Sequence, residues 1–533
     1  MLTFMTVILM ATVLAPLVIS AAALFVGSRM PRPIGRLGAA TAGLGFLAAA
    51  ALAVSAARGE AAHAALGPLS LTADRLAVVL LMLVFRVSAI AQAFAVRYLA
   101  GDPRAACFTA GAGVLTSASA GLVTVDGLIG LAAFWTLAGA ALCLLLGMYW
   151  HLPSARDGVR RTVTAFVIGD LALWAAVALA TATWGRIDLR ALEPGQFSGA
   201  VLPVVAVLIV VAALSRSAQI PFHRWLPATL AAPTPVSALL HAGVVNAGGI
   251  LLIRLATLTA DDAARVLTIL AGAATMAYGA LIMLVKPDVK GALVNSTTAQ
   301  MGFMILTCGL GLWAAAVIHL VAHGFYKATL FLSSGSAVAA GRRHLAAPPV
   351  GQVTRAQRLV AAVAALALPA LALAAAAAVV GLPSGEHAGE QALLIFAAVT
   401  GVAVTWGWLQ RRPGPGGVLG AAAFLIPAAI GYVAIIDTVG GFLYPALPPS
   451  PLGPAAVWVV AAAVLITLGA LAAVRWAPGA DGLRRVLYAN AISAGLPPAR
   501  HPVSPVQFGT AASTPAQPTP AQPTPAQLTG VRS

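Results

Sequence analysis

Residues 201–235 read VLPVVAVLIVVAALSRSAQIPFHRWLPATLAAPTP, and this stretch decides the fold. An apolar run, Val201–Leu214, leads directly into Arg216 and Gln219, and prolines follow at positions 221, 227, 233 and 235. Proline removes a backbone donor and kinks a helix, and in lipid the freed carbonyls must be satisfied by other helices, polar side chains or water. The stretch therefore predicts a broken membrane helix, a construction that recurs at transport sites.

The chain on both sides of this stretch is equally apolar. Of its 533 residues, 60% are hydrophobic and 9% are charged, whereas about 25% of a soluble globular protein is charged. Runs of roughly 18 or more apolar residues recur, and each can cross about 30 Å of hydrocarbon. We predict an all-α polytopic membrane protein of about 14–16 transmembrane helices. The fifteen predicted spans are 3–27, 38–57, 74–96, 105–124, 127–149, 162–184, 200–230, 234–257, 263–285, 291–310, 312–338, 357–382, 390–409, 417–439 and 453–475.

The net charge of +16 is distributed in a way that argues against nucleic-acid binding. Basic residues gather in the loops after odd-numbered spans, for example at 156–161, whereas the loops after even-numbered spans hold few. Cytoplasmic loops of membrane proteins carry such an excess of lysine and arginine. The pattern predicts an N-terminus outside and a C-terminus in the cytoplasm.

One predicted span carries three ionisable residues on a single helical face. His319, His323 and Lys327 follow one another at intervals of four residues, about 6 Å of helical rise each. Charge inside a bilayer is costly, so such groups are functional candidates. Histidine exchanges protons near neutral pH, and burial brings lysine toward that range. We interpret this face as a proton relay; the alternative is a polar face that joins helices.

Asp170 and Arg216 lie in neighbouring predicted spans and form the natural buried ion pair, because each charge alone would be too costly. Arginine does not release its proton at accessible pH, so Arg216 can act only as a fixed charge. Two interpretations stay open: a pair that opens and closes during transport, or a static link between helices.

Further ionisable residues complete the set of pathway candidates. His241 follows the proline turn, and Asn246 on the same span is equally compatible with a simple contact between helices. The remaining candidates are Asp288 and Lys290, beside a polar stripe at 295–300, and two charges expected to be buried without a partner, Asp437 and Arg86.

Other kinds of chemistry leave no trace in the sequence. We find no nucleotide-binding loop, no nucleophile elbow and no paired-cysteine spacing, and Cys107, Cys143 and Cys308 stand alone. The sequence therefore predicts no cofactor, no metal site and no covalent catalysis. We expect a transmembrane domain over 1–480 and a cytoplasmic tail over 481–533. From about residue 498 the tail is rich in Pro, Thr, Ala and Gln and is expected to be disordered.

Three ordered blocks resemble the antiporter-like subunits of respiratory complex I and of Mrp cation/proton antiporters. They are SRSAQIPFHRWLPATLAAPTPVSALLHAGVVNAGG at 215–249, KPDVKGALVNSTTAQMG at 286–302 and HLVAHGFYKATLFLSS at 319–334. Within that superfamily, HRWLPATL, HAGVVNAGG and AQMGFMILTCGLG are most similar to the DabB family, the membrane subunits of two-component inorganic carbon transporters.

The resemblance implies two inverted five-helix repeats, each with a broken helix, the breaks falling in the spans at 200–230 and 357–382. It implies a bacterial inner-membrane protein that passes protons down the membrane potential. It also implies a cytoplasmic partner, DabA, a zinc-containing, carbonic-anhydrase-like protein that hydrates carbon dioxide to bicarbonate. His241, His319, His323 and Lys327 match the family's polar axis, as Asp170, Asp288 and Lys290 match its other polar positions.

The sequence departs from the superfamily at several positions of the proton path. The broken-helix lysine is Arg216 here, and Thr136 after Trp135 stands where the superfamily has glutamate. No charge lies between Arg358 and Glu386, where complex I subunits carry a lysine. Either protons pass only through Asp170, the histidine pair and Lys327, or the path is shortened toward the partner.

Three other functions were weighed. The distal subunit of a complex I-type quinone reductase would carry a long lateral helix, and the 58 residues after position 475 are not expected to form one. A Mrp-type sodium/proton antiporter is disfavoured by the missing glutamate. An inert scaffold is disfavoured by the face that bears His319, His323 and Lys327.

Overall fold

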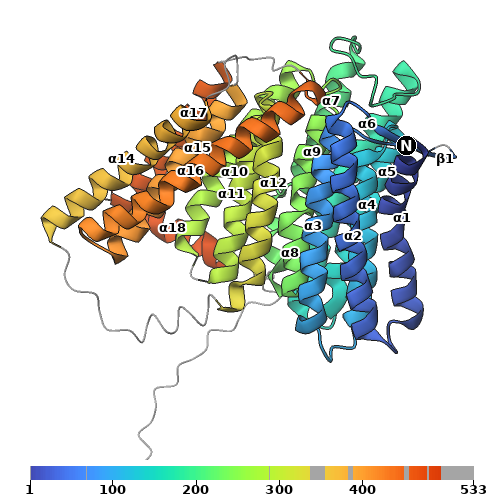
Figure 1. The fold of residues 1–533 in the computed structure, drawn as a ribbon, viewed down its shortest axis with the longest axis horizontal. Helices are drawn as coiled ribbons and strands as arrows, with labels where there is room; N and C mark the ends of the chain where they lie inside the picture. Colours follow the sequence, from blue (N-terminus) through green and yellow to red (C-terminus); the bar gives the residue numbers. More distant parts are fainter. Residues whose placement is uncertain are drawn as a thin grey trace, which may run out of the picture. The chain divides into compact units, whose positions relative to one another are not determined.

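The computed structural model describes residues 2–67, 69–286, 288–336, 354–381, 388–448, 455–476, 479 and 481–493. Within these ranges the chain is a polytopic α-helical membrane protein (Figure 1). The first nine α-helices are α1 (Leu2–Val26), α2 (Pro31–Ala57), α3 (Arg75–Tyr98), α4 (Ala105–Thr124), α5 (Leu128–Leu146), α6 (Pro153–Trp184), α7 (Val201–Arg216), α8 (Thr234–Ala242) and α9 (Ala247–Arg254). The others are α10 (Asp262–Val285), α11 (Val289–Gly309), α12 (Trp313–Leu332), α14 (Arg355–Val380), α15 (Ala388–Arg411), α16 (Pro415–Leu443), α17 (Ala455–Trp476) and α18 (Asp481–Ser493).

Each predicted span coincides with a helical segment of the structure. In the described part of the chain, twelve segments are long and apolar enough to cross a membrane, and α7 and the Ala455–Ala470 part of α17 are shorter apolar helices. The remaining predicted span is α11, whose apolar run contains the polar stripe. Large apolar side chains such as Phe25 (84% exposed) and Leu144 (74% exposed) face outward, which suits contact with lipid.

The break in the span at 200–230 is confirmed. Helix α7 ends at Arg216, and the chain continues through two short 3-10 helices, η2 (Phe222–Trp225) and η3 (Pro227–Ala231). Side chains satisfy the exposed backbone: Trp225 Nε1 donates to the Ser215 carbonyl at 2.9 Å, and the Thr275 hydroxyl accepts from the Ile220 amide at 3.0 Å. These bonds let an irregular backbone lie inside the bundle.

The span predicted at 234–257 also contains a break, which the sequence did not indicate. The predicted span at 234–257 is divided into α8 and α9 by Gly243 and a 3-10 turn, η4 (Val244–Asn246). Ser217 Oγ, just after the end of α7, donates to the Val245 carbonyl in this turn at 2.6 Å. The two breaks therefore contact each other, and each supplies a partner for the other's backbone.

The expected break in the span at 357–382 is absent. Helix α14 runs without interruption over Arg355–Val380 and contains Pro369. A proline in a membrane helix is tolerated when its surroundings satisfy the freed carbonyl. The span predicted at 357–382 is therefore a single helix although it contains Pro369. Neither break nor charge occurs where complex I subunits carry a lysine.

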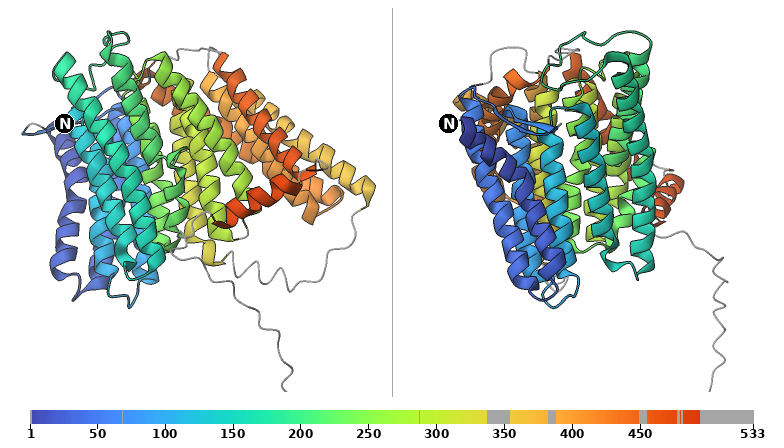
Figure 2. Two further views of the ribbon diagram at one scale, coloured as in Figure 1. Left: turned by 180° about the vertical axis from the view of Figure 1, so that it is seen from behind. Right: turned by 90° about the vertical axis from the view of Figure 1, so that its right-hand side faces the viewer.

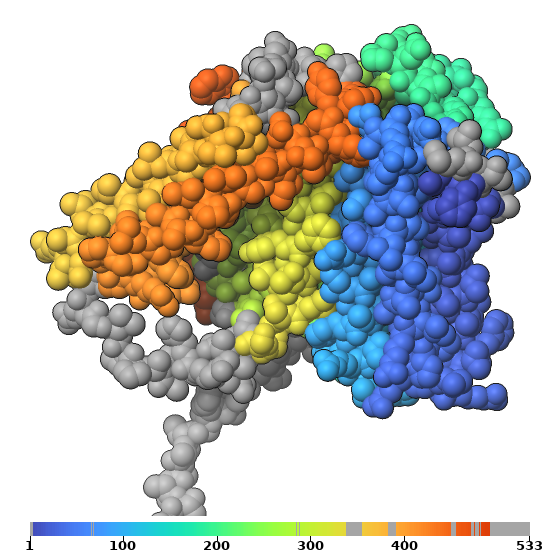
Figure 3. All heavy atoms as spheres, viewed as in Figure 1, coloured from blue at the N-terminus to red at the C-terminus, as the bar shows by residue number. Residues whose placement is uncertain are grey.

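Helix α12 lies at the centre of the packing. It contacts α3, α8, α9 and α11, and also α15 and α16 (Figure 1). Figure 2 shows α18, the short helix after α17, beside α10. Figure 3 shows α2 (blue) and α3 (lighter blue) packed along one surface of the molecule. Residues on α12 can therefore contact helices that precede it in the chain, such as α3 and α8, and helices that follow it, α15 and α16.

Glycines hold α10 and α11 in backbone contact. A Cβ atom added to Gly302 would lie 2.3 Å from the Met276 nitrogen, and one added to Gly279 would lie 2.4 Å from the Ala299 nitrogen. Small residues of this kind allow membrane helices to approach closely. The contact fixes α11 and, with it, the polar stripe that lies beside α12.

A β-hairpin that was not predicted connects α2 and α3. Strand β1 (Ala62–Leu66) pairs antiparallel with β2 (Leu69–Ala73), and His63 lies opposite Thr72. The Asp126 amide donates to the Ser70 carbonyl at 2.9 Å, so the hairpin also contacts the turn between α4 and α5.

Candidate functional site

The expected ion pair between α6 and α7 is present. Arg216 is fully buried, and its Nη2 donates to Asp170 Oδ1 at 2.7 Å. Trp135 Nε1 donates to the same oxygen at 2.8 Å, and the guanidinium lies 4.4 Å from the Trp135 ring and 4.1 Å from the Phe166 ring. The cation is therefore held by one carboxylate and two aromatic faces, which replace the water it would have in solution.

Thr136 does not replace the missing glutamate as a partner of Arg216. Its hydroxyl accepts from Trp174 Nε1 at 3.1 Å. The backbone of α5 instead contributes the Trp135 carbonyl, which accepts from Arg216 Nη1 at 3.1 Å. Gly139, one turn further along α5, leaves the room for the guanidinium, because an added Cβ would lie 2.8 Å from both terminal nitrogens.

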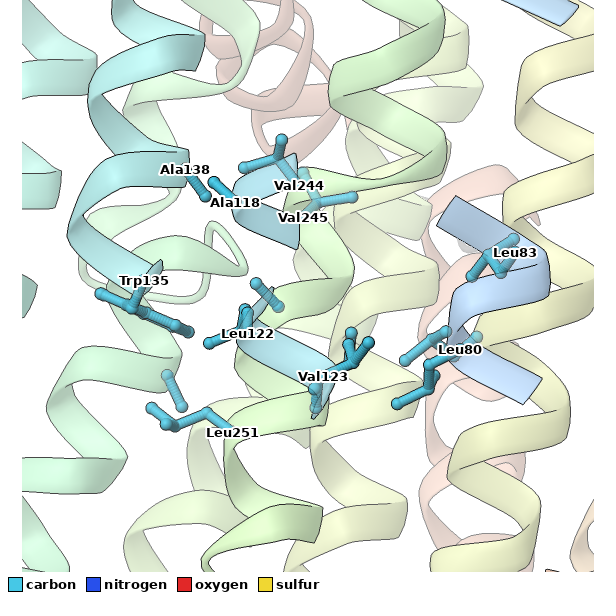
Figure 4. Close-up of a cluster of buried hydrophobic side chains, with 14 of the residues drawn as sticks. Leu80, Leu83, Ala118, Leu122, Val123, Trp135, Ala138, Val244, Val245 and Leu251 are labelled. Carbon is cyan, nitrogen blue, oxygen red and sulfur yellow. The ribbon is translucent and has the colours of Figure 1, made fainter. Parts of the chain in front are cut away.

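A cavity of about 50 Å³ lies beside Arg216, lined by α3, α4, α5, α8, η4 and α9. Figure 4 shows the apolar side chains gathered there from these elements, among them Leu83, Leu122 and Val244. Its polar lining includes Arg216, Asn246 and the hydrogen-bonded Ser88 and Thr116. The volume suits one or two water molecules, at about 30 Å³ each in the liquid.

His323 joins α12 to α11 and α8. Its Nε2 lies 3.1 Å from the His241 carbonyl oxygen, and its Nδ1 lies 2.8 Å from Gln300 Oε1. Because a carbonyl only accepts, Nε2 must carry a hydrogen. His323 is buried, so both of its ring nitrogens are hydrogen-bonded inside the bundle.

His241 and His319 lie on either side of His323. The buried His241 ring stacks on Phe331 with 4.3 Å between centroids, and the His319 ring lies 5.9 Å from the His323 ring. His241 Nδ1 and His319 Nε2 are buried, and neither has a hydrogen-bond partner among the described residues. Each ring therefore has one nitrogen that makes no hydrogen bond to the described residues. His319 also lines a cavity of about 320 Å³ among α12, α14, α15 and α16.

Lys327 continues the same face of α12. It is fully buried, and its ammonium donates to the Leu293 carbonyl at 3.3 Å and to the Ser296 hydroxyl. In the described ranges no carboxylate makes an ion pair with it. A buried amine held only by neutral oxygens keeps its charge at a cost, and loss of its proton relieves that cost.

A family model described as NADH:quinone oxidoreductase/Mrp antiporter, transmembrane, matches residues 126–410, more than half of the chain. This match includes Asp170, Arg216 and the α12 face. The chain belongs to the NADH:quinone oxidoreductase/Mrp antiporter family.

Named relatives place this antiporter-family chain in the DabB branch. The probable inorganic carbon transporter subunit DabB of Bacillus anthracis is 34% identical over 399 residues, 73% of this chain and 75% of the relative. DabB1 of Halothiobacillus neapolitanus is 34% identical over 355 residues, 63% of each chain. The NADH-quinone oxidoreductase subunit L of Mycobacterium tuberculosis is 34% identical over 271 residues, 50% of this chain and 43% of the relative. The predicted resemblance to DabB within the superfamily is thus confirmed.

A solved structure shows the same family fold. The Mrp complex from Dietzia sp. DQ12-45-1b matches with a TM-score of 0.60 and 25% sequence identity over 91% of this chain and 60% of that chain. The match covers α-helices on both sides of α12 and supports the all-α membrane architecture.

Asp288 and Lys290, the two candidates in the loop that resembles the antiporter family, lie at the N-terminal end of α11. Asp288 caps α11, because its Oδ1 accepts from the Gly291 amide at 2.5 Å, and Lys286 Nζ lies 3.8 Å from its other oxygen. Asp288 is exposed and Lys290 is half-buried. Both residues lie about two helical turns before Ser296, at the N-terminal end of α11 rather than in its middle.

Two charges expected to be buried are exposed. The Asp437 side chain lies on the surface of α16, and the Arg86 side chain lies on the surface of α3, 5.3 Å from the Phe46 ring. Both expectations of burial are wrong, because a span read from sequence does not show which face of its helix turns inward. In the described part of the chain no group of three or more His, Cys, Asp or Glu residues could hold a metal ion.

Proposed function

We propose that this antiporter-family chain is the proton-conducting membrane subunit of an energy-coupled inorganic carbon (CO2/bicarbonate) uptake complex. The observation that carries the proposal is His323, buried and hydrogen-bonded on one side to Gln300 and on the other to the His241 carbonyl. The named DabB relatives, probable inorganic carbon transporter subunits, supply the transported substrate class.

The α12 face supplies the groups that a proton route needs. Lys327 binds a proton or releases it toward Ser296, and His323 and His319 lie one and two turns earlier on the same helix. The His319 ring lies against the 320 Å³ cavity, whose lining is apolar except for His319, Thr400 and Tyr432. A proton can thus pass along α12 without a metal or a covalent step.

Arg216 contributes a fixed charge to this route. It cannot give up its proton, but it controls the electrostatic potential around the small cavity that it shares with Asn246 and Ala242. Ala242 is the neighbour of His241, so a change in the Asp170–Arg216 pair alters the charge next to the histidine that contacts His323.

The carbon chemistry belongs to a partner in this proposal. A DabA-like, zinc-containing, carbonic-anhydrase-like subunit on the cytoplasmic side would hydrate carbon dioxide, and proton movement through this chain would drive that hydration in one direction. This chain itself would act as a transporter subunit and not as an enzyme, in a bacterial inner membrane, with its N-terminus outside.

A second function is favoured by other relatives. Subunit L of an NADH-quinone oxidoreductase and a chain of the Mrp complex are also similar. The alternative is therefore a proton-pumping subunit of a complex I-type oxidoreductase or a Mrp-type sodium/proton antiporter.

The proposed function is tested by partner purification and proton flux. The native complex, purified through this chain, should contain a large soluble zinc protein; flavin and iron–sulfur subunits would instead establish the second function. In proteoliposomes of the complex with an imposed potential, an internal pH dye should report proton entry that does not require sodium. His323→Ala should abolish it, whereas His151→Ala, an exposed histidine after α5, should not change it.

A further inference from the structure

A polar pocket of about 560 Å³ lies at the end of the bundle where α4 meets α5. Seven parts of the chain line it: the end of α2 with the loop after it, the β-hairpin, the start of α3, the α4–α5 turn, the loop after α6, the end of α9 with the residues after it, and the segment after α16. Its charged and titratable lining residues are His63, Asp74, Arg75, Asp126, Arg190 and Arg254. None of them belongs to the route on α12.

Hydrogen bonds connect the exposed and buried parts of this pocket. Thr72 Oγ1 donates to Asp126 Oδ2 at 3.0 Å. Thr72 Oγ1 also lies 2.8 Å from His63 Nδ1. A hydroxyl has one hydrogen, which Thr72 gives to Asp126, so it accepts the hydrogen of His63 Nδ1. The chain of bonds therefore runs in one direction, from the exposed His63 to Asp126, which is 2% exposed.

Only one of the two oxygens of the Asp126 carboxylate has a hydrogen-bond partner among the described residues. Its Oδ1 is buried and has no hydrogen-bond partner within the described residues, although the residue lines the pocket. Arg190 Nε lies 3.7 Å from Oδ2, and Arg190 also pairs with Asp188 at 2.8 Å, which divides its charge between two carboxylates. Burial raises the pKa of Asp126, against the opposing effects of Thr72 and Arg190. A buried oxygen without a donor is a place for a proton.

One helical turn separates this pocket from the cavity beside Arg216. Leu122 of α4 and Ile250 of α9 line the inner cavity, and Asp126 and Arg254, each four residues later, line the outer pocket. On α9, which is helical through Arg254, these four residues correspond to roughly 6 Å, whereas Asp126 follows the end of α4. Arg254 lies between the inner cavity and the outer pocket. Its guanidinium donates to the Leu122 carbonyl at 2.6 Å and to the Val125 carbonyl at 2.5 Å.

We propose that His63, Thr72 and Asp126 form a proton wire that joins the solvent at this end of the bundle to the first half of the membrane domain, with the fixed charge of Arg254 beside its inner end. The inference rests on the proposed proton conduction. The charged groups that surround Asp126 are Arg190 and Asp188 after α6, Arg254 on α9, and Asp74 and Arg75 at the start of α3.

Each transfer in the wire moves one proton and breaks and forms one bond to hydrogen. Water protonates His63 Nε2, His63 Nδ1 passes its hydrogen to Thr72 Oγ1, and the Thr72 hydroxyl hydrogen moves to Asp126 Oδ2. The Thr72 hydroxyl is regenerated and His63 is neutral again. Reset requires that Asp126 releases the proton it has gained to a water molecule on its inner side, and that the His63 ring and the Thr72 hydroxyl return to their first orientation.

The test uses the full complex in proteoliposomes with an imposed potential and an internal pH dye. Thr72→Val, which removes only the hydroxyl, and Asp126→Asn should each reduce proton flux at least 10-fold. His63→Gln should reduce it less, because pocket water reaches Thr72. Matched controls are Asp262→Asn, an exposed carboxylate at the start of α10, and His151→Gln; both should conduct like the wild type.

The outcomes separate this inference from the proposed function. Wild-type flux in both Thr72→Val and Asp126→Asn overturns the wire and leaves proton conduction standing, whereas absence of flux in the wild type overturns both. A second readout does not depend on flux. The infrared difference spectrum between acid and alkaline pH should contain a protonated-carboxyl band that Asp126→Asn loses and Asp262→Asn keeps; the same band in Asp126→Asn overturns the wire. If Asp126→Asn does not assemble, Thr72→Val and Asp126→Glu decide.

Discussion

Arg216 Nη2 and Asp170 Oδ1 lie 2.7 Å apart, and the same oxygen accepts from Trp135 Nε1 at 2.8 Å. The arginine is fully buried, whereas the Asp170 side chain is 18% exposed. The pair is therefore asymmetric: the carboxylate retains some access to its surroundings, and the cation has none. Loss of the carboxylate would leave a buried charge with aromatic rings and one carbonyl as its only neighbours.

Asp170→Asn should destabilise the protein by about 3–5 kcal/mol, the usual cost of leaving one member of a buried pair alone. The double variant Asp170→Asn/Arg216→Met removes both charges and should be more stable than the single variant. The measurement is thermal or denaturant unfolding in detergent. Asp481→Asn, which opens the exposed pair of α18, is the matched control and should cost less than about 1 kcal/mol.

Proton flux in the same double variant decides between the two interpretations of the pair. A pair that opens and closes during transport predicts that flux is lost although the protein folds. Wild-type flux in a folded double variant would show that the pair is a static link.

Gln300 should control proton transfer at His323. Its Oε1 lies 2.8 Å from His323 Nδ1, and an amide oxygen at this place can accept only from a ring that carries both hydrogens. A neutral ring, which keeps its hydrogen on Nε2, requires the amide to turn and present its nitrogen. Gln300→Met permits neither bond and should reduce flux at least 10-fold, measured with the pH dye. Gln196→Met, in an exposed loop, should have no effect; equal flux in the two variants would remove Gln300 from the route.

The sequence predicted the α12 face and the Asp170–Arg216 pair because the first depends on residue spacing within one helix and the second on opposite charges in two adjacent spans. Intervals of four residues define a helical face wherever the helix lies, and two opposite charges in adjacent apolar spans have few other partners. The break at Arg216 was predictable for the same reason, since its prolines are in the sequence.

The features that were missed depend on tertiary structure. The break at Gly243 has no proline inside it and is stabilised by Ser217, a residue of another segment. The pocket around Asp126 joins seven segments, and nothing in the sequence of any one of them points to the others. Gly67 between two short runs was the available signal for the hairpin, but the partner of Thr72 could not be read from it.

Lys327→Met should abolish proton flux, because it removes the titrating group and keeps the apolar stem. Lys327→Arg should fail as well, since a guanidinium holds its proton permanently. Ser296→Ala should reduce flux several-fold by removing one of the two oxygens that hold the ammonium. Ser336→Ala, an exposed hydroxyl beyond the end of α12, is the control. Transport by Lys327→Arg at the wild-type rate would show that the charge, and not its exchange, is what the route needs.

Asp437→Asn should leave flux unchanged and should not lower the free energy of unfolding, since it removes a charge from the outer face of a membrane helix. The reason is its exposed position on α16, away from the face of α12. Flux and detergent unfolding measured together test this. A large loss of flux with normal stability would return Asp437 to the pathway.

Stability should depend on pH through Asp126. Burial raises the pKa of this carboxyl in the folded protein, while the unfolded chain has an ordinary aspartate value of about 3.9. Between these two values the folded state binds more protons than the unfolded state. The contribution of Asp126 to the free energy of unfolding therefore falls as pH rises through this window, and is constant above it.

Asp126→Asn removes that pH-dependent contribution. Relative to the wild type, the variant should gain stability as pH rises from about 4, and the difference should then level off. Unfolding of both proteins in detergent across this range measures the difference, with Asp262→Asn as the control for loss of one exposed carboxylate. A difference that shrinks as pH rises would mean that Arg190 and Thr72 stabilise the charged carboxylate more than burial destabilises it, and Asp126 would then be a structural anion rather than a proton carrier.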